Sequence, residues 1–187
     1  MLNEAAAEIP IGSEGLVVLD SFQGNRAPHS DPLVRGAIWG LSLGHSPAHV
    51  YRAIMEGICY GTEDIFEALR AHGYDPSRVM VAGGPTKSPL WMQMHADVSG
   101  QPLHITRGGG VAPLLGSAML AAVGSGVHPD LPTAAAAMVH TESTIEPDME
   151  AHEAYRFYVD RYRETYQQLK SPMHRVAAHL REGEGQA

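Results

Sequence analysis

The chain has 187 residues, which suits one domain or one large lobe of a two-domain enzyme. Its 44% hydrophobic and 18% charged residues are typical of a soluble globular protein with a real core. The net charge of -8, without any Lys/Arg cluster, argues against nucleic acid as a partner, although backbone N–H groups can bind a mononucleotide phosphate at any net charge.

The first third of the chain predicts a lead-in, a strand and a loop. Residues 1–15 are small and polar, and we expect a short helical lead-in before the domain proper at 16–182. LVVLDSF at 16–22 is a short apolar run typical of a buried strand. QGNRAPHSDPL at 23–33 predicts a loop, and its length raises the question of a function.

A long amphipathic helix follows. Ser46 and Pro47 suit its N-cap and first helical position, and Gly73 suits its end. Apolar residues recur at three- and four-residue steps between them. Gly57 and Gly61 lie inside this helix, where each glycine costs roughly 1 kcal/mol relative to alanine. We therefore expect another backbone to pack closely against them.

The rest of the chain alternates between strands and helices, which predicts an α/β fold with helices against a sheet. Tyr155, Tyr158 and Tyr162 lie along one side of the last helix and predict a packing stripe. The expected elements are strands at 78–82 and 102–106, helices at 89–100, 112–123, 131–139 and 149–169, and a disordered tail at 183–187.

Several features bear on the compartment. Cys59 is the only cysteine and lies in an apolar stretch, so no intramolecular disulfide is possible and a buried, inert thiol is expected. MLNEAAAEIP does not resemble a signal peptide, and no apolar stretch reaches the ~18 residues of a membrane span. We therefore expect a cytoplasmic protein without a membrane partner.

The strand–GGPTKSP–helix junction at 79–92 is the best candidate site. Gly83 and Gly84 let a flat or anionic ligand approach the backbone, and the following helix offers free N–H groups. Thr86, Lys87 and Ser88 add two hydroxyls and a cation. The junction lacks the spacing of a P-loop or of GxGxxG. A tight turn that needs glycine for its geometry alone explains the pattern equally well.

Two loops are weaker candidates. RGGG at 107–110 could contact phosphate, but a simple flexible loop is the preferred interpretation. GNRAPHSD at 24–31 could line a cleft with Asn25 and Arg26. We prefer a structural role for it, in which Arg26 pairs with Asp31.

Other chemistry has little support. His45 and His49 lie four apart, but Pro47 lies between them and no carboxylate completes a zinc site, so no protein metal site is predicted. Cys59 lies in a predicted buried helix, so it is not expected to act as a hydrolase nucleophile.

Together, these motifs resemble the C-terminal domain of the FGGY family of carbohydrate kinases. GAIWGLSLGHSPAHVYRAIME at 36–56 is similar to the second family signature, and VMVAGGPTKSPLWMQMHADVSGQPL at 79–103 to its adenosine motif. GLVVLDSFQGNRAPHSDPLVRG and LLGSAMLAAVGSGVHPDL also match, in family order over about residues 12–140. GNRAPHSD resembles the loop of ribulose- and xylulose-type members more than that of glycerol kinases.

The resemblance implies an actin-like, RNase H-like ATPase fold in two lobes, of which this chain is part, with a mixed sheet flanked by helices. It implies ATP, with Mg²⁺ bound through the nucleotide phosphates, and transfer of the γ-phosphate to a ketopentose or similar carbohydrate. Gly83 and Gly84 would lie against adenine and ribose, Ser88 near the adenine, and Thr86 and Lys87 beside the nucleotide. Asn25 and Arg26 would lie near the interdomain cleft.

Two departures from the family pattern matter. GGGVAP stands where members often carry an acidic residue, so no acidic role is transferred. The N-terminal lobe, with a phosphate loop, most sugar contacts and the catalytic base, is expected to lie outside these residues, as are the opening strands of the C-terminal lobe. We therefore expect no catalytic residue here and no kinase activity from the chain alone.

Two further expectations follow. Uncovered strand edges and helix faces predict self-association. A catalytically silent, actin-like module that serves binding or assembly is the alternative function.

Overall fold

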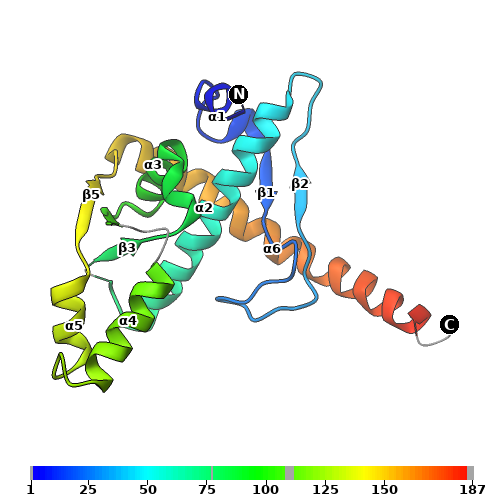
Figure 1. Cartoon of the computed structure of the whole chain (residues 1–187). Helices are drawn as coiled ribbons and strands as arrows, with labels where there is room; N and C mark the ends of the chain where they lie inside the picture. Colours follow the sequence, from blue (N-terminus) through cyan, green and yellow to red (C-terminus); the bar gives the residue numbers. More distant parts are fainter. Residues whose placement is uncertain (1, 77, 108–111, 185–187) are drawn as a thin grey trace.

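The computed structural model describes residues 2–76, 78–107 and 112–184. Figure 1 shows helices and strands interleaved along the chain. The helices are α1 (Leu2–Ala7), α2 (Pro47–Ala71), α3 (Pro89–Ser99), α4 (Ala112–Gly124), α5 (Leu131–Met138) and α6 (Met149–Glu184), with 3₁₀ turns η1 (Ser13–Gly15) and η2 (Gly84–Lys87). The strands are β1 (Val17–Leu19), β2 (Ala37–Trp39), β3 (Val79–Val81), β4 (Leu103–Thr106) and β5 (Thr141–Ile145).

The strands form two small sheets. β1 and β2 pair antiparallel, with Val18 opposite Ile38. In the second sheet β4 lies between β3, to which it is parallel, and β5, to which it is antiparallel. This sheet is therefore mixed, as predicted, and β3 forms one of its edges. The sequence patterns did not predict β2, β5 or the two 3₁₀ turns.

The central element is α2, which runs from Pro47 as the sequence predicts. The N–H of Ser46 donates to the ring of His49 at 3.1 Å, which fixes the first turn. Gly73, at φ 81°, follows the last turn in the left-handed region that favours glycine. The buried face of α2 joins β1, α3 and α6 in one core, whose members include Leu19, Val34, Met55, Cys59, Tyr60, Met94, Val98, Tyr155, Val159, Tyr162 and Tyr166.

The two helix glycines have different reasons. A Cβ on Gly57 would lie 2.5 Å from the carbonyl oxygen of Val18, so a backbone packs there as predicted. At Gly61 the nearest atoms are the hydroxyl of Tyr162, at 3.0 Å, and the carboxylate of Asp20. The expectation of a close backbone is wrong at this second position, where side chains fill the space.

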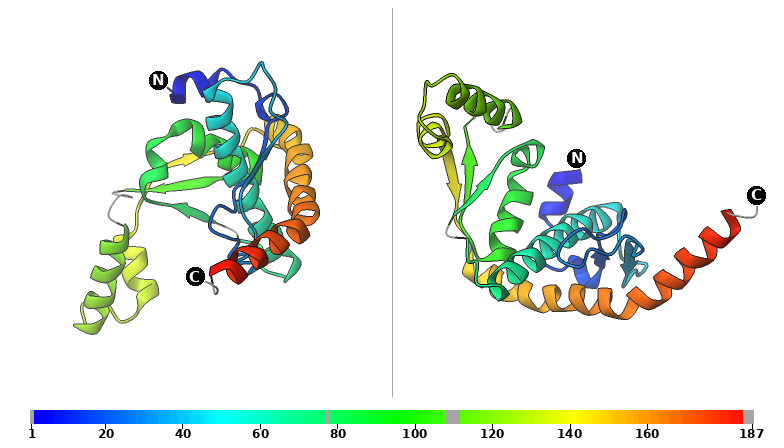
Figure 2. Two further views of the ribbon diagram at one scale, coloured as in Figure 1. Left: turned by 90° about the vertical axis from the view of Figure 1, so that its right-hand side faces the viewer. Right: turned by 90° about the horizontal axis from the view of Figure 1, so that it is seen from below.

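Helix α6 crosses the whole molecule. Its first half packs in the core through the expected stripe, with Tyr155 and Tyr162 buried and Tyr158 half-buried. The predicted end at residue 169 is wrong, because the helix continues through Pro172 to Glu184. Figure 2 shows this second half extending away from the body. Of the tail expected at 183–187, α6 includes the first two residues, and the other three lie outside the described residues.

Helices α4 and α5 pack on each other and project beyond the β3-β4-β5 sheet (Figure 2). No residue of α4, all of which the structure describes, is buried. Leu114 and Leu120 are exposed. No described helix combines the length and the apolar character that a membrane span requires.

Candidate functional site

The GGPTKSP junction forms a sharp corner between β3 and α3. Gly83 takes φ 96°, a conformation that a residue with a Cβ rarely adopts, and η2 follows at once. Ser88 then caps α3, where its Oγ accepts a hydrogen bond from the N–H of Trp91 at 3.4 Å. The five predicted nucleotide-site residues, Gly83, Gly84, Thr86, Lys87 and Ser88, therefore lie within one turn.

The outer side of this corner is open. Among the described residues, no heavy atom beyond its chain neighbours lies within 4 Å of where a Cβ on Gly84 would stand. At Gly83 the Pro85 ring, at 3.8 Å, is the one described group that comes that close. The hydroxyl of Thr86 donates to the carbonyl oxygen of Gly83 at 2.7 Å, so it serves the turn itself. Lys87 is exposed. A flat ligand would therefore meet bare backbone and a cation.

An apolar cavity of about 200 Å³ lies directly behind the corner. Its lining comes from η2, α2, α3 and the sheet and includes Pro85, Phe66, Val81 and His95. Burial lowers the pKa of His95 from 6.5 to about 4, so the ring is neutral at physiological pH.

Asn25 and Arg26 line a second cavity, of about 220 Å³, with Asp20 and Gly61. Thr62 of α2 lines this cavity and also the apolar one behind the corner. The two cavities therefore share one residue of α2, while Asn25 and Arg26 line one of them and Pro85 of the corner lines the other.

The loop that carries Asn25 and Arg26 is not held as predicted. Within the described part of the chain, no ion pair joins Arg26 to Asp31, so that expectation is wrong. The carboxylate of Asp31 instead binds Nε2 of His174 at 2.8 Å and accepts from the Tyr166 hydroxyl at 3.1 Å and the Leu33 N–H at 3.1 Å. The cause is the unexpected length of α6, which brings His174 to the loop.

The ionisation of Asp31 follows from these contacts. Burial alone would raise its pKa, but the bonds from His174, the Leu33 N–H and Tyr166 outweigh that effect and hold the pKa below its ordinary value. Asn25 and Asp31 also exchange backbone hydrogen bonds of 2.8 and 2.7 Å. The loop is thus closed at its base by both backbone and side chains.

A buried polar network around Glu56 was not foreseen. Glu56 is 1% exposed and accepts from the N–H of Gly12 (3.1 Å), the hydroxyl of Ser13 (2.8 Å) and Nε of Arg52 (2.9 Å). Arg52 also donates to the carbonyl oxygen of Ala6 at 2.9 Å. The i,i+4 spacing on a helix was the available signal. The network joins the N-terminal segment to α2.

Residues 108–110 of the RGGG loop lie outside the described residues. Arg107 is described, and its N–H donates to the carbonyl oxygen of His140 at 2.9 Å. Among the described residues, no three His, Cys, Asp or Glu side chains gather in a group that could hold a metal ion.

Comparisons with a family model and with known proteins all point to carbohydrate kinases. Residues 1–125 match the C-terminal domain of the FGGY family of carbohydrate kinases. The chain is 34% identical over 165 residues to xylulose kinase of Escherichia coli K12, covering 88% of this chain and 34% of that protein. It is 41% identical over 137 residues to ribulokinase of Mycolicibacterium smegmatis, covering 73% of this chain and 24% of that protein.

Solved structures agree in fold. The crystal structure of xylulose kinase from Rhodospirillum rubrum superposes with a TM-score of 0.78 at 32% identity, over 92% of this chain and 34% of that one. The ligand-bound xylulose kinase from Lactobacillus acidophilus superposes with a TM-score of 0.83 at 24% identity, over 94% of this chain and 35% of that one. At this identity the similarity supports the fold alone. The expected actin-like α/β architecture is confirmed.

This chain spans about a third of the length of the xylulose kinases that it matches. The family match, over residues 1–125, spans the GNRAPHSD loop, α2, the GG corner and α3. By that match, the chain belongs to the FGGY family of carbohydrate kinases through its C-terminal domain.

Proposed function

We propose that this chain is the nucleotide-binding part of a kinase that transfers the γ-phosphate of ATP to a hydroxyl of a ketopentose of the xylulose or ribulose type. The matches to xylulose kinases and to a ribulokinase support the acceptor class. The observation that carries the nucleotide assignment is the open corner at Gly83 and Gly84, which leaves space for a flat base.

In this proposal the base and ribose lie on Gly83 and Gly84, with Ser88 near the adenine. Thr86 and Lys87 flank the nucleotide, and Lys87 supplies the nearby positive charge. The corner contains no carboxylate, so Mg²⁺ would be held through the nucleotide phosphates, where it would neutralise the charge of the transferred group. Asn25 and Arg26 would face the cleft between this domain and an N-terminal lobe.

We also propose that these 187 residues do not catalyse the transfer alone. Phosphoryl transfer requires the metal, phosphate clamps, a positioned hydroxyl and a base in one assembly. The corner supplies one exposed cation, Lys87, while the hydroxyls of Thr86 and Ser88 are engaged in the turn and in the cap of α3. The partner would be a polypeptide that supplies the N-terminal kinase lobe, and self-association is expected through exposed apolar surface. ATP use and the lone free cysteine suit a cytoplasmic enzyme.

The nucleotide assignment can be tested by NMR, which detects weak binding. Millimolar Mg²⁺–ADP should shift the amide signals of Gly83, Gly84 and Lys87. A Gly84→Leu variant should reduce those shifts, because its side chain would begin in the open space where the ligand would lie. Gly116→Leu is the matched control, since that position is equally open and lies on α4. Absence of any shift in the unmodified chain would contradict the assignment.

The catalytic statement needs a separate assay. The purified chain, given ATP, Mg²⁺ and xylulose or ribulose, should form no sugar phosphate. Robust product formation that tracks with the chain through purification would show that the catalytic base lies within these residues.

A further inference from the structure

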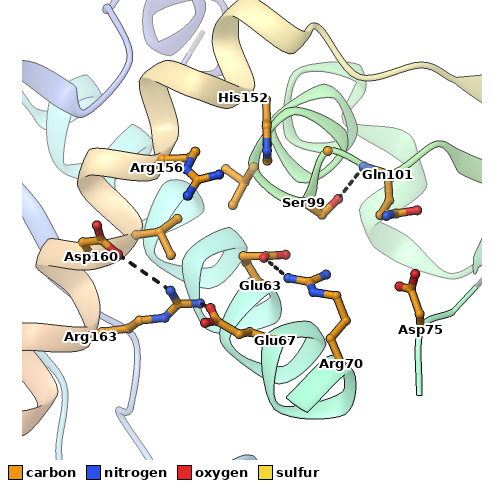
Figure 3. Close-up of a pocket in the computed structure, with 13 residues that line it drawn as sticks. Glu63, Glu67, Arg70, Asp75, Ser99, Gln101, His152, Arg156, Asp160 and Arg163 are labelled. Atoms are coloured by element: carbon orange, nitrogen blue, oxygen red, sulfur yellow. Dashed lines mark hydrogen bonds and ion pairs between the residues drawn. The ribbon is translucent and has the colours of Figure 1, made fainter. Parts of the chain in front are cut away.

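A third cavity, larger than the two described above, lies away from the GG corner. It has a volume of about 530 Å³, within the range of small-molecule sites, and opens where the second half of α2, the end of α3 and the first half of α6 meet. Figure 3 shows charged side chains from α2 and α6 converging on it, with Ser99 and Gln101 at the end of α3.

Most of the charges around this cavity are already paired. Arg70 binds Glu63 through Oε1, and Arg163 binds Glu67. Arg163 also contacts Asp160, at 3.7 Å (Figure 3). These two arginines contact three of the four carboxylates that line the space.

Three groups remain available to a ligand. Arg156 and Asp75 line the cavity, and neither has a hydrogen-bond or ion-pair partner among the described residues. Glu63 is 9% exposed, and its Oε2 is buried with no hydrogen-bond partner in the described chain. A buried acceptor left unsatisfied is costly, and a bound donor would remove that cost.

These groups define one ligand chemistry. A free guanidinium binds carboxylate or phosphate through two parallel hydrogen bonds. The Oε2 of Glu63 and the carboxylate of Asp75 can only accept, so they call for hydroxyl donors on the same molecule. We propose that this cavity binds a small polyhydroxylated anion, a sugar phosphate or a sugar acid, with its anionic group on Arg156 and its hydroxyls on Glu63 and Asp75.

The site differs from the proposed nucleotide corner. The corner precedes the first residue of α3, whereas Ser99 and Gly100 border the cavity at the other end, about 16 Å away along an 11-residue helix. His152 of α6 packs under Gly100 and donates from Nδ1 to the carbonyl oxygen of Asp97 at 2.8 Å. A ligand here would contact both α6 and the end of α3, which this hydrogen bond joins. The cavity would be an effector-type site, additional to the nucleotide corner, and ligand binding there does not depend on the proposed function.

The test uses the whole 187-residue chain, with calorimetry and amide NMR as readouts. The probes are a ketopentose 5-phosphate, gluconate, inorganic phosphate and a neutral amino acid. We expect one of the first two to bind, with shifts at Ser99, Gly100 and Gln101 and none at Gly83. Arg156→Gln should weaken binding by about tenfold or more, because a charge-assisted pair is lost. Its thermal midpoint should be unchanged, since Arg156 has no partner in the described chain.

Arg181→Gln, on the same helix but away from the cavity, should bind as the unmodified chain does. Asp75→Asn should weaken the binding of the hydroxylated anions and leave the binding of inorganic phosphate unchanged. The proposal is overturned if none of the probes binds at millimolar concentration, or if Arg156→Gln binds undiminished. It is also overturned if inorganic phosphate binds as tightly as the sugar phosphate. The same holds if the amino acid binds more tightly than the sugar phosphate and gluconate.

Discussion

Glu56 is the residue on which the N-terminal segment depends most. Its carboxylate is buried beside Arg52 and accepts from Gly12 and Ser13, so it joins segments some 44 residues apart. Removing one partner of such a pair leaves an uncompensated buried charge. We expect Glu56→Gln to lower the free energy of unfolding by about 3–5 kcal/mol, measured by urea denaturation.

The control is Glu153→Gln, since Glu153 is exposed on α6. It should change the free energy of unfolding by less than about 0.5 kcal/mol. A change of similar size in the Glu56 variant would show that the network adds no net stability.

His95 gives the fold a pH dependence. Its pKa in the folded chain is about 4, below the ordinary 6.5, because burial disfavours the charged ring. The unfolded chain therefore binds the proton more readily between these values. The free energy of unfolding therefore keeps its full value, as far as His95 is concerned, above pH 6.5. It falls by up to about 3 kcal/mol as the pH drops from 6.5 toward 4.

His95→Leu should flatten this part of the stability curve, measured by urea denaturation at several pH values. His179→Leu, at an exposed position on α6, should leave the curve unchanged. An identical slope in the His95 variant would mean that other groups cause the acid sensitivity.

Among the elements, α2 and β1 are in close backbone contact. Since a Cβ on Gly57 would lie 2.5 Å from a backbone oxygen, Gly57→Ala must separate the helix from the strand. We expect a loss of about 1–3 kcal/mol in the free energy of unfolding, measured by thermal or urea unfolding. Gly116→Ala on α4 meets open space and should instead gain up to about 1 kcal/mol from helix propensity.

Element type could be predicted where the sequence carries local signals. Ser46-Pro47 and Gly73 bracket α2, and Gly100 at φ 64° ends α3, because caps and glycine stops depend on neighbouring residues. β5 could not be predicted, since Thr141–Ile145 is polar and becomes a strand only by pairing with β4. The extent of α6 was missed because side-chain contacts of its second half, such as that of His174, carry it past Pro172.

The same division holds for the candidate site. The GG corner is local, so its residues could be named from the sequence. The cavity at Arg156 is assembled from three helices and the segments that follow α2 and α3, and no local pattern could place Glu63, Asp75 and Arg156 around one space.

At the scale of the whole molecule, the second half of α6 presents an apolar surface. A cavity of about 500 Å³ beside Arg35 is lined by Leu169, Pro172, Met173, Val176 and Leu180, of which Val176 and Leu180 are 60% and 61% exposed. We expect concentration-dependent self-association in sedimentation velocity, reduced by Val176→Asp combined with Leu180→Asp.

Val127→Asp, at another exposed apolar position, should leave association unchanged. A compact, strictly monomeric species at all concentrations would contradict the expectation. Undiminished association of the double variant would exclude α6 as the contact surface.

The contacts of Asp31 also order events during synthesis. Its side-chain partners Tyr166 and His174 are encoded 135 and 143 residues later. While the ribosome is still translating the middle of the chain, the GNRAPHSD loop can close its backbone and bind its carboxylate to the Leu33 N–H, but Tyr166 and His174 have not yet been made. The part of the protein that faces the proposed cleft would therefore reach its final form among the last, after the bulk of the nascent domain has emerged.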